Sequence, residues 1–325
     1  MFEKNDRYLY KAFGFHIASD IPFPGSKPAE ERAGMVDVVI EWGDEAALWE
    51  SLSTPEEAFV VQDNTVLFRI ANTAIYMVEA GRRVVVTPEE GAELERIRLF
   101  LDGYCMAILL LQRRILPLHG SAIALDGLAY AIVGFSGAGK STMAKALLNQ
   151  GFTFISDDII PVVLHGTEKE AATVWPALPE QKLWQESLSE MGMGVEEYRT
   201  VYERQARSGE SATGLRTKYA IPVTRFTHQA LPLAGIFELV KKEGDDALSL
   251  APIQGAERLR TLAHHTFHRS LIEPMGLMEW HFRTTSSLAN RTEMLKLSRP
   301  ADLYSAPGLV RLVLDALASE KENAS

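Results

Sequence analysis

The sequence predicts an α/β protein in two parts: a small β-rich N-terminal domain over residues 1–98, followed by an α/β domain with a glycine-rich loop over residues 99–325. Three observations lead to this prediction. Short runs rich in β-branched and aromatic residues, split by Gly, Asn and Asp, fill the N-terminal part. A glycine-rich loop stands between an apolar run and a helix-forming segment near the middle of the chain. The length of 325 residues is long for one domain and suits two domains, or one large domain with an appendage.

The N-terminal part is expected to be a meander or sandwich of short strands. Such a domain could pack against the rest of the chain, form an oligomer contact, or capture a peptide as an added strand. A structural role is favoured, because exposed sheet edges have to be covered in any case. The predicted strands lie within residues 8–17 and at 36–42, 59–61, 66–70, 74–78 and 83–86.

The stretch from Leu94 to Leu116 predicts one long amphipathic helix, because its apolar residues recur at every third or fourth position. This helix would carry the chain out of the β-rich part, so we place the domain boundary near its first turn, at residue 98. Cys105, the only cysteine of the chain, lies in this apolar stretch. That position favours a small core residue over a nucleophile.

The segment from Gly134 to Ser141 fits the pattern G-x-x-x-x-G-K-[ST] of a phosphate-binding loop. The apolar run 129–133 before it predicts a buried parallel strand, and residues 143–150 after it predict a helix. Such a loop turns backbone N–H groups toward phosphates, aided by the positive end of the following helix. The sequence therefore predicts a site for ATP and Mg²⁺, with contacts from Gly134, Ser136, Gly137, Ala138, Gly139, Lys140, Ser141 and Thr142.

Two adjacent carboxylates, Asp157 and Asp158, follow a predicted strand at residues 152–155. We expect this strand to be the sheet neighbour of the strand that precedes the glycine-rich loop, because ligands of open α/β sheets sit at the carboxyl ends of strands. One carboxylate could hold the metal while the other takes the proton from an attacking hydroxyl. The alternative is an aspartate pair that only caps a turn.

A third element, His119-Gly120-Ser121, leads into a predicted strand at 122–124 and a hairpin turn at Asp126-Gly127. Alone, this histidine would more often be a hydrogen-bonded structural imidazole than a catalytic group. The combination HGSAIALDGLAYAIVGFSGAGKS…SDD, however, resembles the core of the HPr serine kinase/phosphorylase family.

The resemblance implies a P-loop kinase domain related to HPr kinase and phosphoenolpyruvate carboxykinase, and phosphate transfer to a protein serine. Carried over by position, it implies that Asp157 is the base toward the serine hydroxyl with His119 beside it, and that Asp158 and Ser141 serve Mg²⁺. The loop pattern itself indicates that Lys140 supplies a mobile cation to the phosphates.

The chain departs from that family at two points. Thr142 stands where the family has glutamate, and the later E-I-R-G-L-G signature has no counterpart. Because that signature is tied to phosphorolysis and to HPr recognition, the resemblance does not extend to these activities.

The flanking segments are similar to the HPr-kinase-like proteins of peptide natural-product pathways, which include the lasso-peptide kinases. This second resemblance covers most of the chain and implies a serine of a precursor peptide as the acceptor. The segments that carry it are YKAFGFHIASDIPFP from Tyr10, LQRRILPLH from Leu111, WPALPEQKLW from Trp175 and LSRPADL from Leu297.

Further cations are expected at the phosphates. Lys182, at the start of a helix predicted over 182–191, stands where the HPr-like pattern approaches the phosphates; a solvated lysine is the alternative. Residues 196–222 form the most charged stretch and predict a closing loop that brings Arg216 and Lys218, with Arg204 and Arg207 behind them. The alternative is a surface loop without such a role.

The remaining segments predict the rest of the α/β domain. Helices are expected at 256–271, 280–288 and 307–319, and strands at 161–164, 173–176, 234–240, 248–250 and 294–297.

The composition of the chain argues against two classes of binding partner, nucleic acid and membranes. A formal charge of −10 without a basic block argues against nucleic acid. No run approaches the roughly 18 apolar residues of a membrane helix, and the N-terminus has no apolar signal segment, so we expect a cytoplasmic protein with no membrane partner.

The sequence thus predicts an ATP- and Mg²⁺-dependent serine kinase acting on a protein or peptide, such as a lasso-peptide or other ribosomal precursor, possible as a homo-oligomer. Two alternatives stay open: a small-molecule P-loop kinase, and a nucleotide-binding regulator without catalysis.

Overall fold

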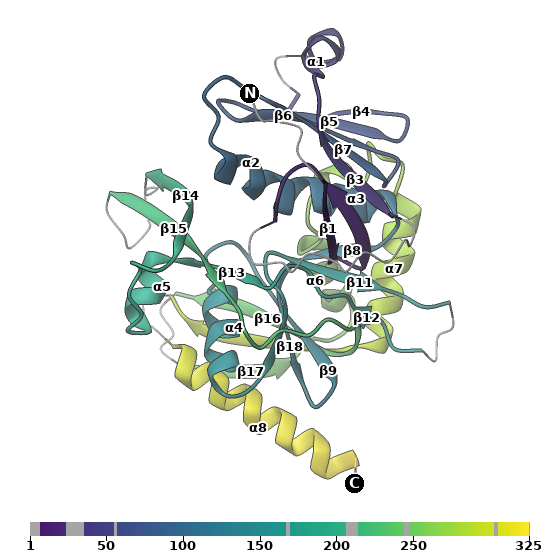
Figure 1. Ribbon diagram of the computed structural model, residues 1–325. Coiled ribbons are helices and arrows are strands. Elements are labelled where there is room, and N and C mark those ends of the chain that lie inside the picture. The colour runs from purple at the N-terminus through teal and green to yellow at the C-terminus, as the bar shows by residue number, and fades with distance from the viewer. Residues whose placement is uncertain are drawn as a thin grey trace.

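The computed structural model describes residues 7–23, 36–54, 57–166, 170–205, 214–243, 247–301 and 305–324 of the chain. Within these residues it is a mixed α/β structure with three sheets (Figure 1). No helix among them is long and apolar enough to cross a lipid bilayer.

The N-terminal strands form one seven-stranded sheet in the order β1-β2-β3-β7-β6-β5-β4. The predicted meander corresponds to the antiparallel run from β4 to β7, whereas β3 pairs in parallel with both β2 and β7. A short helix, α1 (Ala46–Leu52), follows β3. The strands are β1 (Tyr8–Ala12), β2 (Phe15–Ser19), β3 (Val38–Trp42), β4 (Val60–Gln62), β5 (Thr65–Ile70), β6 (Ala74–Glu79) and β7 (Arg83–Pro88).

The helix predicted over 94–116 is divided into three pieces and is shorter than expected. The pieces are α2 (Leu94–Phe100), the π-helical turn η1 (Leu101–Cys105) and α3 (Met106–Gln112). Arg114 then adopts a positive φ of 56°, which ends the helical path and turns the chain into the next strand. The apolar side of these pieces packs against the seven-stranded sheet, and the two form one core. In Figure 1 the helical pieces lie below this sheet.

An eight-stranded sheet holds the glycine-rich loop. β9 pairs antiparallel with β8 and in parallel with β16, which pairs in parallel with β18. The path through the other strands is β10-β8-β11-β12-β16-β18-β17. The strands are β8 (Leu116–Leu125), β9 (Leu128–Val133), β10 (Thr153–Ser156), β11 (Ile159–Val163), β12 (Thr173–Val174), β16 (Leu231–Lys242), β17 (Ser249–Pro252) and β18 (Glu293–Pro300).

The prediction that the strand before the aspartates pairs with the strand before the glycine-rich loop was wrong. β10 pairs with β8, not with β9, so β8 lies between the two strands. Because β8 is antiparallel to both, β9 and β10 still run in the same direction and end at the same edge of the sheet. The aspartates therefore reach the loop despite the inserted strand.

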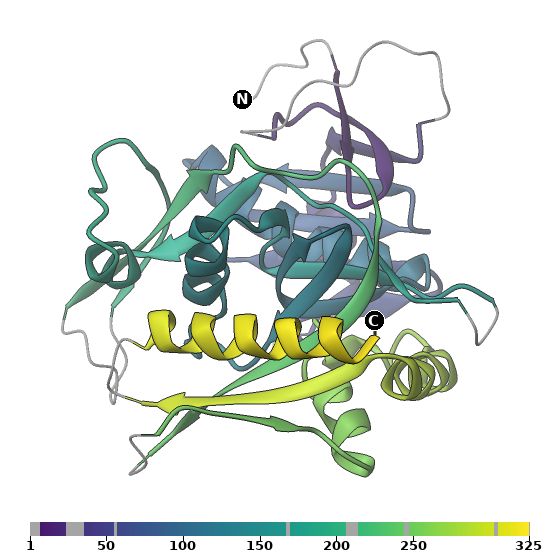
Figure 2. The ribbon, with the colours of Figure 1, turned by 90° about the horizontal axis from the view of Figure 1, so that it is seen from below.

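Helices cover both faces of this sheet. α4 (Lys140–Asn149) and α8 (Ala306–Ala324) pack together on one face, where Figure 2 shows α8 running alongside the sheet. α6 (Ala256–His264) and α7 (Met278–Arg291) pack on the other. The helix predicted over 256–271 stops at His264, and only a short 3-10 turn, η2 (Arg269–Leu271), follows.

A small third sheet, β13-β15-β14, corrects two predictions. Lys182 lies on β13 (Glu180–Trp184), and the helix α5 begins only at Gln185 and ends at Glu190. The stretch predicted as a loop over 196–222 contains β14 (Arg199–Gln205) and β15 (Leu215–Pro222), whose outward positions are polar and conceal the strand pattern. Arg207 lies outside the described residues.

Candidate functional site

The glycine-rich loop connects β9 to α4 as the sequence predicts. Gly134 allows the loop to pass close to β16, since a Cβ at this position would lie 2.6 Å from the carbonyl oxygen of Leu239. Gly139 is the N-cap residue of α4 with a φ of 103°, a conformation that L side chains rarely adopt. The loop therefore ends at the positive end of a helix, which attracts anions.

Lys140 is buried at the base of the loop, with 8% of its surface exposed. Its Nζ donates hydrogen bonds to the carbonyl oxygens of Gly134, at 2.9 Å, and Phe135, at 3.2 Å. Burial lowers the pKa of this ammonium to about 8, although the nearby aspartates oppose the shift. The charge is thus held beside the loop backbone, within reach of a bound phosphate.

Asp157 accepts hydrogen bonds from three groups around the pocket. Its Oδ1 accepts hydrogen bonds from the hydroxyls of Ser121, at 2.5 Å, and Ser141, at 2.9 Å. Its Oδ2 accepts one from the backbone N–H of Lys182, at 2.9 Å. Removal from water and the adjacent Asp158 raise the pKa of Asp157 above its ordinary value. This carboxyl is therefore closer to proton exchange at neutral pH than an ordinary aspartate.

Asp158 has a different environment from its neighbour. Its two carboxylate oxygens lie 3.3 Å from Nζ of Lys182 and 3.3 Å from Nζ of Lys218. Removal from water alone would raise the pKa of Asp158, but the two lysines outweigh it and hold this pKa well below the usual range. Its backbone has a φ of 64°, a left-handed conformation that costs energy for a residue other than glycine and is often found at functional sites.

His119 lies on β8 beside the aspartates. Its Nδ1 is 3.0 Å from the backbone oxygen of Asp158, and because a carbonyl only accepts, Nδ1 carries the proton. The ring stacks on Phe267 with centroids 5.0 Å apart. Burial and then the charge of Lys140 lower the pKa of His119 to about 4, so the imidazole is neutral at pH 7.

One pocket collects most of the residues that the sequence singles out. It is lined by the predicted residues His119, Ser136, Gly137, Gly139, Lys140, Ser141, Thr142, Asp157, Asp158, Lys182 and Lys218, together with Leu183, Trp184 and Ser187. Gly134 and Ala138 belong to the loop but do not line the pocket.

Two predicted cations on described residues lie outside this lining: Arg204, whose guanidinium is 5.2 Å from the centroid of the Trp184 ring, and Arg216. The guanidinium of Arg216 stacks over the ring of Trp184, 4.3 Å from the centroid, and its Nε donates to Glu186 at 2.7 Å. Since Trp184 itself lines the pocket, Arg216 borders the site through this ring.

Four further residues that sequence reasoning did not assign support the loop and the aspartates. Ser121 contacts Asp157, and its signal was its place in the His-Gly-Ser motif. Gln181 donates to the backbone oxygen of Ser141 at 2.8 Å, and Ser187 shares a 2.8 Å hydrogen bond with Thr142. Arg299 donates to the backbone oxygen of Ala138 at 2.9 Å across 161 residues of chain. Local spacing gave no signal for the last three.

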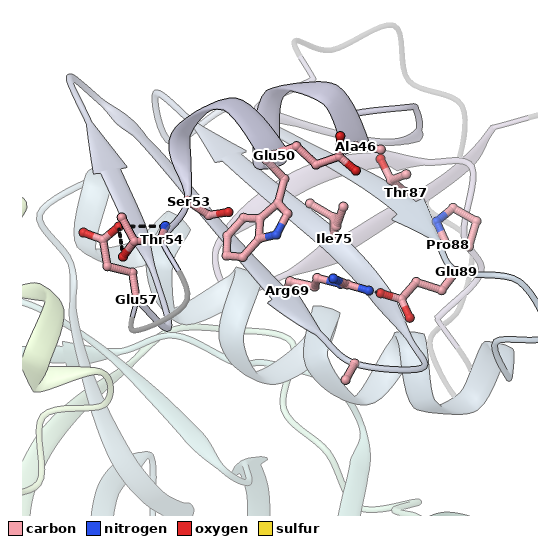
Figure 3. A pocket seen from close by; sticks show the side chains of 12 residues that line it. Ala46, Glu50, Ser53, Thr54, Glu57, Arg69, Ile75, Thr87, Pro88 and Glu89 are labelled. Atoms are coloured by element: carbon pink, nitrogen blue, oxygen red, sulfur yellow. Dashed lines mark hydrogen bonds and ion pairs between the residues drawn. The ribbon is translucent and has the colours of Figure 1, made fainter.

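A larger hollow, of about 720 Å³, lies elsewhere, on the seven-stranded sheet beside α1 (Figure 3). Trp49 and the Arg69–Glu89 ion pair, at 2.6 Å, line it. None of the residues predicted for the nucleotide site takes part, so its size alone does not make it the functional site.

The donor set of the pocket fits Mg²⁺. Two carboxylates and the hydroxyl of Ser141 are hard oxygen donors, and Mg²⁺ is usually held by one or two carboxylates together with substrate phosphates. The hydroxyl of Ser141 is hydrogen-bonded to Asp157. Asp158, which the sequence predicts as the second metal ligand, instead forms ion pairs with Lys182 and Lys218.

Comparison with known proteins gives distant likenesses. No model of a known protein family matches the chain. A solved structure of the HPr(Ser) kinase/phosphatase from Coxiella burnetii aligns with 63% of this chain and 98% of its own, at 12% identity and a TM-score of 0.30. An HPr kinase/phosphorylase from Nitrosomonas europaea is 23% identical over 185 residues, which cover 54% of this chain and 53% of that relative. The chain thus spans about half the length of this curated relative, and over those 185 residues it is weakly homologous to HPr kinase/phosphorylase.

Proposed function

We propose that this protein transfers the terminal phosphate of ATP to a serine hydroxyl of a protein or peptide. The observation that supports this most is the hydrogen bond between Ser141 of the glycine-rich loop and Asp157, which joins a phosphate-binding loop to a carboxyl able to accept a proton. The weak homology to HPr kinase/phosphorylase suggests kinase-type chemistry.

The loop and Lys140 would bind the phosphates of ATP. The backbone N–H groups at the start of α4 and the ammonium of Lys140 offer positive charge from one side. A phosphate oxygen would replace the loop carbonyls as the partner of Nζ. Lys182 and Lys218 line the same pocket and offer further positive charge to the transferred group.

The aspartates would divide the remaining work. Asp157, with its raised pKa, would accept the proton of the serine hydroxyl as the oxygen attacks phosphorus and the bond to ADP breaks. Asp158, whose pKa is held low, stays charged at all working pH values and would bind Mg²⁺ together with Ser141. When bound, Mg²⁺ would neutralise charge on the phosphate oxygens.

His119 would orient the acceptor. Its Nδ1–H donates a hydrogen bond to the backbone oxygen of Asp158, which leaves Nε2 as an acceptor for the serine hydroxyl. A neutral ring suits this role better than an imidazolium, because it adds no further positive charge next to Lys140.

The acceptor that we propose is the serine of a ribosomal precursor peptide, of the kind made in lasso-peptide pathways. This rests on the sequence likeness of the flanking segments to kinases of such pathways. Trp184 and the stacked Arg216 at the edge of the pocket would contact the peptide near its serine.

Mass spectrometry of acceptors incubated with the protein, ATP and Mg²⁺ tests the proposal. The acceptors are HPr and a precursor peptide encoded beside this gene, and the variant Lys140→Ala is the negative control. Lys145→Ala, on the same helix but outside the pocket lining, is the matched control and should keep activity. We expect one or more added phosphates on the peptide. Label on HPr alone would contradict the peptide acceptor, and label on neither would favour a small hydroxyl substrate or a nucleotide-operated switch.

A further inference from the structure

Arg299 is a cation beside the glycine-rich loop that the proposed function does not use. Its Nε donates a hydrogen bond to the backbone oxygen of Ala138 at 2.9 Å. The guanidinium also lies against the next residue of the loop, since a Cβ added to Gly139 would be 3.5 Å from Nη2 and 3.6 Å from Nε. One side chain therefore rests on the peptide group that joins Ala138 to Gly139.

The parallel strands of the eight-stranded sheet bring Arg299 to this place. β18 runs parallel to β16, and β16 runs parallel to β9, so all three strands end at the same edge of the sheet. Leu297 of β18 packs in the core that α4 and α8 share with this sheet. Because side chains alternate along a strand, Arg299, two residues later, points to the same face. Its side chain thus reaches the loop where α4 begins.

The hydrogen bond on Ala138 fixes the direction of a neighbouring N–H group. The described residues contain no cis peptide bond, and in a planar trans peptide group the C=O and the following N–H point in opposite directions. When Arg299 holds the oxygen of Ala138, the N–H of Gly139 is therefore turned away from Arg299. Gly139 lines the nucleotide pocket, whereas Ala138 does not. Among the described residues this N–H has no hydrogen-bond partner, so it is available to a ligand.

The charge of Arg299 favours a bound phosphate more than it favours the protein alone. Gly139 is the N-cap residue of α4, and the positive end of a helix repels a cation. Lys140, the first residue of α4, adds a second positive charge at the same end. An anion in the pocket would offset this repulsion. A charged donor on the oxygen of Ala138 also polarises the peptide group, which makes the N–H of Gly139 a stronger donor.

We propose that Arg299 is a positioning residue for the nucleotide, which holds the peptide group between Ala138 and Gly139 so that the N–H of Gly139 donates to the diphosphate part of ATP. A loop of this pattern places its backbone N–H groups around the α- and β-phosphates, so ATP and ADP share the contact. Arg299 acts through the loop and not on the transferred phosphate. The inference rests on the nucleotide site of the proposed function, but not on the acceptor or on phosphate transfer.

Isothermal titration with MgATP and MgADP measures the effect of Arg299→Met. We expect R299M to weaken both nucleotides by the same factor, about tenfold or more, as for the loss of a hydrogen bond to a charged group. Arg299→Lys keeps a charge and a donor and should recover part of this loss. Arg258→Met is the matched control, because Arg258 of α6 also donates to a backbone oxygen, that of Thr292, but lies outside the pocket lining. R258M should bind both nucleotides like wild type.

The amide signal of Gly139 in NMR spectra tests the mechanism directly. Labelling with ¹³C-carbonyl alanine and ¹⁵N-glycine selects the glycines that follow an alanine, which are Gly34, Gly81, Gly139 and Gly235. MgADP should move the amide proton of Gly139 downfield in wild type, because its N–H gains a charged acceptor. At saturating MgADP we expect a clearly smaller shift in R299M and an unchanged shift in R258M.

Thermal unfolding without nucleotide separates positioning from a general loss of structure. R299M and R258M each leave a carbonyl oxygen without its arginine donor, so we expect similar falls in melting temperature. A loss of nucleotide affinity of the same size in both variants would reveal general destabilisation and would overturn the inference. Failure of both R299M and R299K to fold would overturn it as well.

Other outcomes separate this inference from the proposed function. If R299M binds MgADP like wild type, loses affinity for MgATP alone, or keeps the full shift of Gly139, the role of Arg299 is overturned and the kinase proposal stands. Wild type that binds both nucleotides with the expected dependence on Arg299, yet phosphorylates no acceptor, sustains this inference and overturns the kinase proposal. Wild type that binds neither nucleotide overturns both.

Discussion

At the scale of residues, two adjacent aspartates acquire opposite properties from their surroundings. Asp157 accepts hydrogen bonds from two hydroxyls and one backbone N–H, and its pKa is raised. Asp158 lies against two ammonium groups, and its pKa is depressed. Pairs of acids whose environments push their pKa values apart commonly divide proton transfer from charge stabilisation.

Substitution of the two aspartates should therefore affect the reaction in different ways. We expect Asp157→Asn to lower kcat by about a hundredfold or more, the usual contribution of a general base, while the Kd of MgATP changes little. Asp158→Asn should instead raise the Mg²⁺ concentration needed for half-maximal rate by about tenfold. Steady-state rates over a Mg²⁺ titration measure both effects. If D157N shifted the Mg²⁺ requirement and D158N did not, the two roles would have to be exchanged.

At the scale of elements, the sequence predicted what is decided locally. The strand–loop–helix unit of β9 and α4 follows from an apolar run, a glycine pattern and helix formers, all of which lie within a few residues of each other. The pairing of β10 with β8 could not be predicted, because strand order depends on contacts between distant segments. Lys182 was assigned to a helix because a five-residue strand has too little pattern to outweigh helix-forming residues after it.

The same limit applied to the candidate site. Motif residues such as Lys140 and Asp157 could be named in advance, since the loop pattern and the paired acids are contiguous in sequence. Arg299 could not, because it reaches Ala138 from 161 residues away.

The strand β8 gives a prediction at this scale. Gly120 lies between His119 and Ser121, and a Cβ added there would be 2.3 Å from the carbonyl oxygen of Ile132 on β9. We expect Gly120→Ala to force the two strands apart and to lower the free energy of unfolding by about 1–3 kcal/mol, as overpacking does. Urea denaturation measures this change.

Gly103 provides the matched control for this glycine. It is helical, and an added Cβ would meet nothing within 4 Å. Gly103→Ala should keep the stability or raise it by up to about 1 kcal/mol, because alanine favours helix over glycine. Equal destabilisation by both substitutions would show that the close approach of β8 and β9 is not the cause.

At the scale of the whole molecule, one core joins parts of the chain that the sequence assigned to separate domains. The core beneath the seven-stranded sheet includes side chains of α2, η1 and α3, and also Ile159 of β11, Ala177, Leu178 and Leu271. The predicted boundary at residue 98 falls within α2 (Leu94–Phe100) and next to Ile97, which is fully buried in this core. Apolar contacts therefore continue across the position where a linker would be expected.

This shared core leads us to predict a single cooperative unfolding transition. In scanning calorimetry the calorimetric and van't Hoff enthalpies should agree, as they do when no part unfolds alone. Addition of MgATP at about a hundred times its Kd should stabilise the whole transition by about 2.7 kcal/mol, because a ligand that binds only the folded state shifts the equilibrium of every part coupled to its site. Lys140→Ala should lose that shift. Two separate transitions, of which MgATP moves only one, would instead establish that the N-terminal sheet folds independently of the nucleotide site.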